Sequence, residues 1–234
     1  IGFVLGALIA ALAFGEFRPR TGSSPVVRFV LGALSAIGAL VFLGCPWRAY
    51  LRLAGGDLNA IPGILGLIGG ILIGIVFLRR GFSLGRNHPA PRAMGWMMPV
   101  LMIGLLLLLL LAPQFGTDAD GNPAGPVFFS KEGPGAAQAP LLTALAIGLL
   151  VGFLAQRSRF CTVGAFRDVI LLRDPHLFNG VVAFVVAAFV TNLILGQFKP
   201  GFVDQPVAHT NALWNLLGMV LAGLAFTLAG GCPG

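Results

Sequence analysis

The sequence predicts an all-α protein: a polytopic membrane helical bundle with pseudo-symmetric repeats and short interrupted or re-entrant helices that carry cysteine motifs. Three observations lead there. The 234 residues are 57% hydrophobic and only 10% charged, whereas a soluble domain is about half apolar and one quarter charged. Several uncharged runs reach the length of a membrane-spanning helix, about 17–25 residues. Each of the three cysteines stands at or near the end of an apolar run, beside residues that break or restart a helix.

Seven hydrophobic segments follow one another along the chain. Each is predicted to be a helix, because an isolated strand cannot satisfy its backbone hydrogen bonds in lipid. The segments cover residues 1–15, 27–44, 58–78, 94–113, 140–156, 177–197 and 210–230. Glycines recur every three or four residues at Gly63, Gly66, Gly70 and Gly74, and as the pairs Gly2/Gly6 and Gly148/Gly152. Such small residues predict close helix–helix contacts in the membrane.

The positive residues predict an orientation. Eleven of the fifteen Lys and Arg residues fall in 16–28, 79–93 and 157–175, which the positive-inside rule places in the cytoplasm. The other four are Arg48, Arg52, Lys131 and Lys199. All seven segments alternate consistently with this assignment. The net charge of +7 therefore marks topology, and we expect no nucleic-acid binding, because the arginines lie in short loops and not on one basic face.

The longest connection, 114–139, is polar and rich in Gly and Pro, and is expected to be an external loop. It divides the chain into a first membrane half, 1–113, with one Gly-Cys-Pro motif, and a second half, 140–234, with two cysteine motifs. The chain begins inside an apolar run without an initiator Met and stops directly after a motif. We therefore expect it to be a fragment, with the second half truncated.

The first motif is Gly44-Cys45-Pro46-Trp47-Arg48. Gly favours the end of one helix, and Pro suits the first turn of the next. Cys45 is thus predicted to be the N-cap of a short helix over 46–56, whose positive end favours a thiolate or a bound anion. Arg48 and Arg52 follow at three and seven residues, on the face of the thiol, where two guanidinium groups suit a small oxyanion.

The second motif runs from Ser158 to Asp168 and contains Arg159, Cys161, Gly164 and Arg167. Ser158 is the expected N-cap, which would put Cys161 in the first turn of a short helix. Gly164 and Ala165, three and four residues later, leave room beside the thiol. Asp168 is expected to pair with Arg157, Arg159 or Arg167 and so hold the motif in shape.

The third motif, Gly231-Cys232-Pro233, repeats the first break. The segments 36–46 and 223–233 form a weak repeat, since both are helices rich in small residues that stop at Gly-Cys-Pro. Duplicated halves with interrupted helices are the usual build of transporters, in which the site lies where the breaks meet. A single cysteine in an apolar segment is most often a packing residue. Here three cysteines stand at helix interruptions, and two of them have the same flanking residues, which favours a functional role over simple packing.

Other chemistry is less favoured by the sequence. There is no Cys-x-x-Cys pair, so zinc-knuckle and thioredoxin-like motifs are absent, and the cysteines do not lie in secreted loops as a disulfide framework would. His88, His176 and His209 stand singly in loops or at segment starts, without a second ligand at metal-binding spacing. We expect no metal, no cofactor and no catalytic residue.

The motifs GCPWR at 44–48, RSRFCTVGAFRD at 157–168 and GGCP at 230–233 together resemble the YeeE/YedE family of bacterial inner-membrane sulphur-compound transporters. The sequence of residues 44–57 is most similar to the YedE branch, which is described as selenium transporters. The resemblance implies multi-pass insertion into the lipid of the bacterial inner membrane and a constriction lined by Cys45, Cys161 and Cys232. These thiols would pass a thiosulfate-like sulphur or selenium anion inward, to a cytoplasmic sulphur-carrier protein.

Under this hypothesis Arg48 and Arg52 attract the anion, with Gly44, Gly164 and Gly231 beside the thiols. Pro46, Pro233, Arg159, Arg167 and Asp168 would shape the motifs. Two alternatives remain open. One is a membrane thiol oxidoreductase that exchanges electrons with a quinone, against which stands the missing Cys-x-x-Cys. The other is a structural subunit of a membrane complex, in which the cysteines merely pack.

Overall fold

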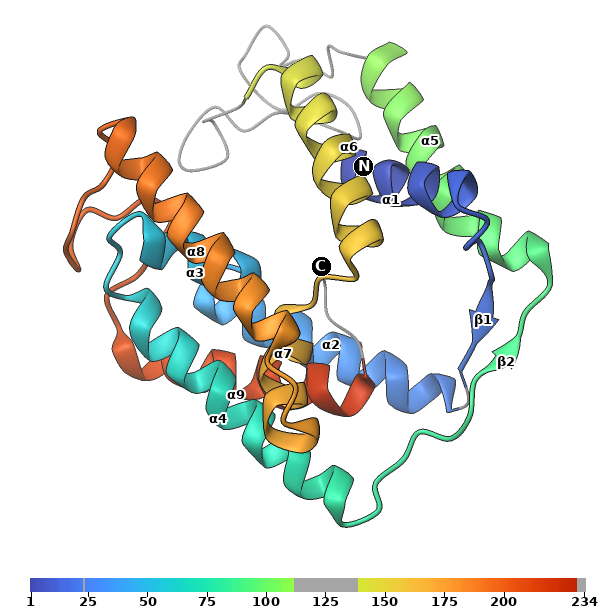
Figure 1. The fold of residues 1–234 in the computed structure, drawn as a ribbon, viewed down its shortest axis with the longest axis horizontal. Coiled ribbons are helices and arrows are strands. Elements are labelled where there is room, and N and C mark those ends of the chain that lie inside the picture. The colour runs from blue at the N-terminus through green and yellow to red at the C-terminus, as the bar shows by residue number, and fades with distance from the viewer. Residues whose placement is uncertain (23, 112–138, 231–234) are drawn as a thin grey trace, which may run out of the picture. The chain divides into compact units, whose positions relative to one another are not determined.

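The computed structural model describes residues 1–22, 24–111 and 139–230 (Figure 1). The elements in chain order are α1 (Gly2–Ala13), β1 (Arg20–Thr21), α2 (Pro25–Phe42), α3 (Pro46–Ala54), α4 (Ala60–Arg79), β2 (His88–Pro89), α5 (Arg92–Leu111), α6 (Leu141–Ser158), α7 (Thr162–Leu172), α8 (His176–Ile194) and α9 (Ala212–Ala229). The named strands in these ranges are β1 and β2, which pair antiparallel over two residues each. The predicted all-α class is confirmed.

Every predicted apolar segment contains a helix. Within the described ranges, six helical stretches are long and apolar enough to cross a membrane. They are Pro25–Ala54, Ala60–Arg79, Arg92–Leu111, Leu141–Leu172, His176–Ile194 and Ala212–Ala229. Two of them join a long helix to a short one, α2 to α3 and α6 to α7. Helix α1 is shorter, with 12 residues. The chain is therefore a multi-pass, all-α membrane protein, as predicted.

Contacts divide the chain into two compact units. Unit 1 comprises Ile1–Thr21 and Asn87–Arg159, and unit 2 comprises Gly22–Arg86 and Phe160–Gly234. Each unit thus contains residues from before and after the 114–139 connection, nearly all of which lies outside the described residues. The division of the chain at this connection into 1–113 and 140–234 stays a prediction. The three motifs fall in unit 2, apart from Arg157 to Arg159 at the end of unit 1.

Unit 1 is built on the close approach of α1 and α6. A Cβ added at Gly6 would lie 2.0 Å from the Leu149 carbonyl oxygen, and one at Gly152 equally close to the Phe3 carbonyl oxygen. The glycine pairs of the sequence therefore serve close packing, as predicted. The two helices run parallel, because both end at the same place, where Glu16 pairs with Arg159 at 3.6 Å and Arg157 at 4.0 Å.

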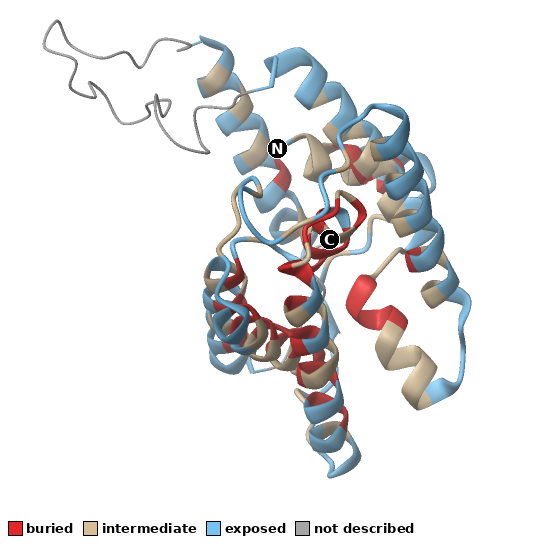
Figure 2. Ribbon diagram, turned by 90° about the vertical axis from the view of Figure 1, so that its left-hand side faces the viewer, coloured by how far each residue is buried: buried red, intermediate tan, exposed pale blue. Residues whose placement is uncertain are grey.

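Unit 2 is built on α9, against which α4 and α2 pack. Cβ atoms added at Gly66, Gly70 and Gly74 would strike Leu216, Val220 and Thr227 in turn, so α4 and α9 run parallel. Helix α2 runs antiparallel to α9, since Arg28 near its start donates to the Ala229 carbonyl at 3.2 Å and Gly38 faces Gly218. The buried residues of these three helices (red in Figure 2) include Phe42, Leu67, Ile71 and Met219.

These helix directions agree with the orientation derived from the charges. The first and fifth apolar segments are parallel, the third and seventh are parallel, and the second opposes the seventh, as strict alternation requires. The strand pair β1–β2 also joins the two loops assigned to the cytoplasm, 16–28 and 79–93. Within unit 2, Asp57 and Gly201 form a parallel bridge.

We predict that Gly70→Ala destabilises the protein, whereas the neighbouring Gly69→Ala does not. A Cβ at Gly70 would lie 2.2 Å from the Val220 carbonyl oxygen, while the nearest atom to one at Gly69 is 3.9 Å away. Overpacking of this kind costs about 1–3 kcal/mol. The fraction that stays monodisperse in detergent after heating should fall at a lower temperature for Gly70→Ala alone. Equal thermal stability of the two variants would contradict this packing.

Candidate functional site

The first motif turns the chain from α2 into the short helix α3. Helix α2 ends at Phe42, Leu43 takes the left-handed conformation with φ 60°, and Cys45 is the extended N-cap of α3 with Pro46 next. Cys45 is thus the N-cap, as predicted, although the helix ends at Ala54, two residues earlier than expected. The terminating residue is Leu43 and not Gly44. At Gly44 an added Cβ would lie 2.8 Å from Cδ of Arg48, so a larger residue there would displace that side chain.

The second motif does the same for α7, but the predicted cap was wrong. Ser158 is the last residue of α6, and its hydroxyl donates back to the Leu154 carbonyl at 2.8 Å. Arg159 then ends α6 in the left-handed conformation, with φ 52°. Cys161 itself is the N-cap of α7, and its Sγ accepts a hydrogen bond from the Gly164 amide at 3.1 Å. A Cβ at Gly164 would crowd this sulfur at 3.1 Å.

Three aromatic rings bring the two motifs together. Trp47, two residues after Cys45, lies edge-on to Phe160, the residue before Cys161, with ring centroids 5.3 Å apart. Phe184 contacts both rings at 6.0 Å. Phe184 stands in the middle of α8, so this aromatic cluster fixes both cysteine motifs beside the midpoint of one membrane-spanning helix.

The two short helices leave this midpoint in opposite directions along α8. Helix α3 runs parallel to α8, from Trp47 beside Phe184 to Gly55 beside Asn192. Helix α7 runs antiparallel to α8, from Phe160 beside Gly180 and Phe184 to Phe166 beside Phe178. The first turn of α7 is buried and the remainder is half-buried or exposed (Figure 2). Two helix N-termini, each with partial positive charge, therefore face the same level of the bundle.

The predicted arginines have different environments. Arg52 is buried: its Nε donates to Asp57 at 2.6 Å, its Nη1 donates to the Phe42 carbonyl at 2.9 Å, and its guanidinium stacks 4.4 Å from the Phe42 ring centroid. Arg48 is half-buried and makes a long, 3.5 Å hydrogen bond to the Pro206 carbonyl. In the second motif Asp168 pairs with Arg167 at 2.9 Å, one of the partners expected for it.

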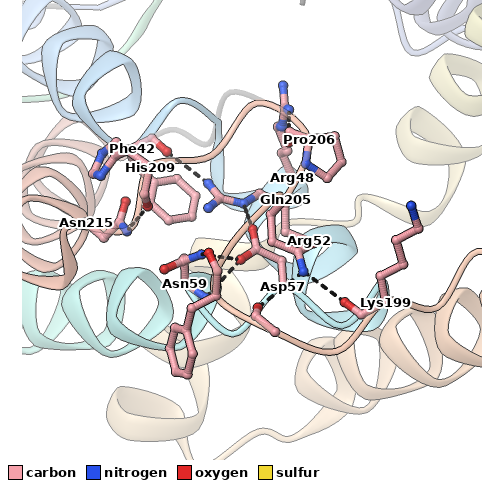
Figure 3. Close-up of polar contacts among 12 residues, drawn as sticks. Phe42, Arg48, Arg52, Asp57, Asn59, Lys199, Gln205, Pro206, His209 and Asn215 are labelled. Carbon is pink, nitrogen blue, oxygen red and sulfur yellow. Dashed lines mark hydrogen bonds and ion pairs between the residues drawn. The ribbon is translucent and has the colours of Figure 1, made fainter.

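Both arginines line a cavity of about 600 Å³ at the end of α3. Its lining also includes polar residues that sequence reasoning missed, because they come from the 192–206 region: Asn192, Gln197, Lys199, Asp204 and Gln205. Neither Cys45 nor Cys161 is among its lining residues. Figure 3 shows Arg48, Lys199 and Gln205 on this side of α3, with Arg52 turned inward to Asp57 and Phe42.

His209 makes two hydrogen bonds that link separate segments of unit 2. Its Nε2 donates to the Val41 carbonyl at 2.8 Å, and its own carbonyl accepts from Nδ2 of the buried Asn215 (Figure 3). His209 is therefore a half-buried residue that joins α2 to the start of α9.

The third motif, with Gly231, Cys232 and Pro233, lies outside the described residues. Helix α9 ends at Ala229, and Gly230 has the left-handed conformation, with φ 68°, that a helix stop requires. Because α2 and α9 are antiparallel, Gly230 and the Leu43–Gly44 turn stand at opposite ends of this helix pair. The helices that lead into the first and third motifs therefore end on opposite sides of the bundle's centre.

Comparisons with known proteins bear on this region. Residues 157–234 match the model of a family described as sulphur transport. The thiosulfate transporter TsuA of Spirochaeta thermophila is 36% identical over 90 residues, which are 38% of this chain and 27% of that protein. TsuA of Escherichia coli is 31% identical over 93 residues, 39% of this chain and 26% of that protein. The matches thus span about a quarter of these curated relatives. No solved structure matches the chain significantly.

These matches confirm the resemblance to the YeeE/YedE family that the motifs predicted. Both relatives carry the name thiosulfate transporter, and neither bears on the selenium branch.

We predict that Cys45 reacts faster than Cys161 with a maleimide. Cys45 is exposed and its sulfur makes no capping hydrogen bond, whereas Cys161 is half-buried and accepts from Gly164. Trp47→Ala should raise the rate at Cys161 several-fold, because it removes a ring packed against Phe160. Trp214→Ala, which removes a ring that is 55% exposed, is the matched control. Peptide-resolved mass spectrometry measures each rate, and equal rates at the two thiols would contradict the geometry.

We also predict that Asp57→Asn destabilises the protein by about 3–5 kcal/mol, the usual cost of breaking a buried ion pair. The Arg52 and Asp57 side chains are only 6% and 4% exposed, so the remaining charge stays buried. Asp204→Asn, at an exposed carboxylate, should have little effect on stability. Thermal unfolding in detergent compares the two, and a difference below experimental error would exclude a structural role for the pair.

Proposed function

We propose that this protein takes up a small sulphur-containing anion, thiosulfate or a close analogue, across the bacterial inner membrane, and that Cys45 and Cys161 lie on its path. One observation carries the proposal. Two short helices, each capped by a cysteine, begin at the middle of α8 and run apart. Transporters commonly bind anions where the N-termini of half-helices converge near the bilayer midplane.

The chemistry of thiosulfate suits this arrangement. Its oxygens are hard and charged, so they are stabilised by helix N-termini and amide donors, while its terminal sulfur is soft and can accept a hydrogen bond from a thiol, which is a weak donor. The aromatic cluster of Trp47, Phe160 and Phe184 excludes water beside the path. The family match and the relatives named thiosulfate transporter support the same cargo.

The proposed role of Cys232 follows from the repeat. The first and third motifs share Gly-Cys-Pro at the end of a segment rich in small residues. From this repeat we propose that Cys232 is the third thiol of the relay and serves its cytoplasmic end. There the anion, or sulphur derived from it, would pass to a sulphur-carrier protein. Selenium analogues would be accepted on the same chemical grounds.

We expect Cys45→Ala, Cys161→Ala and Cys232→Ala each to lower thiosulfate uptake at least tenfold. The full-length protein is expressed in cells that lack their own uptake route, and radiolabelled uptake is normalised to the amount of protein in the membrane. Ser35→Ala removes one heavy atom from a buried position of α2, as the cysteine exchanges do at theirs, and should retain uptake. A panel of thiosulfate, sulfite, selenite and sulfate would identify the cargo.

Wild-type uptake in all three alanine variants would end this proposal. Free-thiol counts before and after turnover separate transport from redox chemistry. Thiols that stay reduced are expected for a carrier, and a disulfide that forms and disappears during turnover would favour an oxidoreductase instead.

A further inference from the structure

We infer that the cavity at the end of α3 is an antechamber that collects oxyanions before they reach the thiols. This inference rests on the proposed function and assigns the residues that confer its electrostatic selectivity: Arg48 and Lys199, with Asp204 opposing them. The sequence pattern identified Arg48 but neither Lys199 nor Asp204, which come from the connection between α8 and α9.

The wall of the cavity is held by the backbone and is therefore preformed. The connection after α8 is bound to the turn between α3 and α4: the Lys199 amide donates to the Gly55 carbonyl at 2.9 Å and the Gly201 amide to the Gly56 carbonyl at 3.1 Å. The Leu58 amide donates to the Gly201 carbonyl at 3.1 Å. A side-chain hydrogen bond adds to this wall: Gln205 Nε2 donates to the Lys199 carbonyl at 2.9 Å. The backbone of Lys199 is thus fixed opposite α3.

The charges in this cavity do not cancel. Arg52 and Asp57 form a buried pair and offset each other. Arg48, Lys199 and Asp204 take part in no ion pair within the described ranges, which leaves two cations against one carboxylate. An anion in the cavity would therefore meet uncompensated positive charge and the side-chain amides of Asn192 and Gln197.

The size of the cavity favours capture over tight binding. A volume of about 600 Å³ is in the range that holds a drug-sized ligand, so a small oxyanion keeps water around it here. Clefts lined by one sign of charge raise the local concentration of the ligand and its rate of association, and salt weakens the effect. Arg48 lies three residues after Cys45, within one turn of α3, and is the cavity residue nearest in sequence to the first thiol.

The test measures the concentration dependence of thiosulfate uptake by the full-length protein. Arg48→Gln and Lys199→Gln should each raise KM about 3–10-fold with a smaller change in maximal rate, and Asp204→Asn should lower KM. Asp204 has φ 58°, a conformation that Asn also tolerates, so this exchange removes charge without straining the backbone. Arg80→Gln, which removes an equal charge at the far end of α4, should leave KM unchanged.

Ionic strength provides a second readout. The wild-type KM should rise with added salt of an anion that is not transported, and the rise should be smaller in Lys199→Gln. Unchanged KM values in all three cavity variants, or a KM that rises in Asp204→Asn, would overturn the antechamber. The proposed function fails separately, if the wild-type protein takes up no thiosulfate or if the three cysteine variants take it up normally.

Discussion

The buried ion pair between Arg52 and Asp57 fixes the geometry on which the site depends. Arg52 belongs to α3, the carbonyl it binds belongs to Phe42 at the end of α2, and Asp57 precedes α4. One guanidinium thus ties three consecutive helices together. Asp57 accepts two further hydrogen bonds, from the backbone amide and the side chain of Asn59, both at 2.9 Å. Pairing and hydrogen bonds at Nε and Nη1 offset the cost of burying this guanidinium, although its buried Nη2 has no hydrogen-bond partner among the described residues.

This tie has a direct effect on the cysteine. Helix α3 has only nine residues, too few to be stable in isolation, and it must lie along the C-terminal half of α8 for Cys45 to stand near the midpoint. The ion pair holds the far end of α3 and the aromatic cluster holds the near end. Asn59 extends the tie to the next connection, since its side chain donates to the Phe202 carbonyl at 2.7 Å. One continuous hydrogen-bond network and the aromatic cluster of Trp47, Phe160 and Phe184 therefore fix the positions of both the cavity and Cys45.

Local features were predictable from the sequence, and long-range ones were not. Gly-Cys-Pro correctly predicted that Cys45 caps a helix, because the preferences of Gly and Pro at helix ends are local. Ser158 was preferred over Cys161 as a cap for the same kind of reason, since serine is the stronger capping residue. The structure places the cap at Cys161 instead, because α6 ends in a left-handed turn at Arg159, one residue after Ser158.

Long-range contacts could not be predicted in this way. The burial of Arg52 depends on its ion pair with a carboxylate across a turn, and the contact of Trp47 with Phe160 joins residues more than a hundred positions apart. Helical spacing placed Arg48 and Arg52 on one face, and both line one cavity. Only the fold shows that Arg52 is held in a buried ion pair with Asp57, whereas Arg48 is not.

The meeting of α3 and α7 at the middle of α8 has a consequence for energetics. A charge that crossed the membrane at this level would pass the gap between the two N-termini. Moving one elementary charge through 100 mV requires about 2.3 kcal/mol, so a dianion entering a cell that is negative inside must overcome about twice that. The partial positive charges of both helix ends stand at this gap and lower the local barrier, but they supply no net work. Accumulation of a doubly charged cargo would require coupling to another gradient or consumption of the cargo inside the cell.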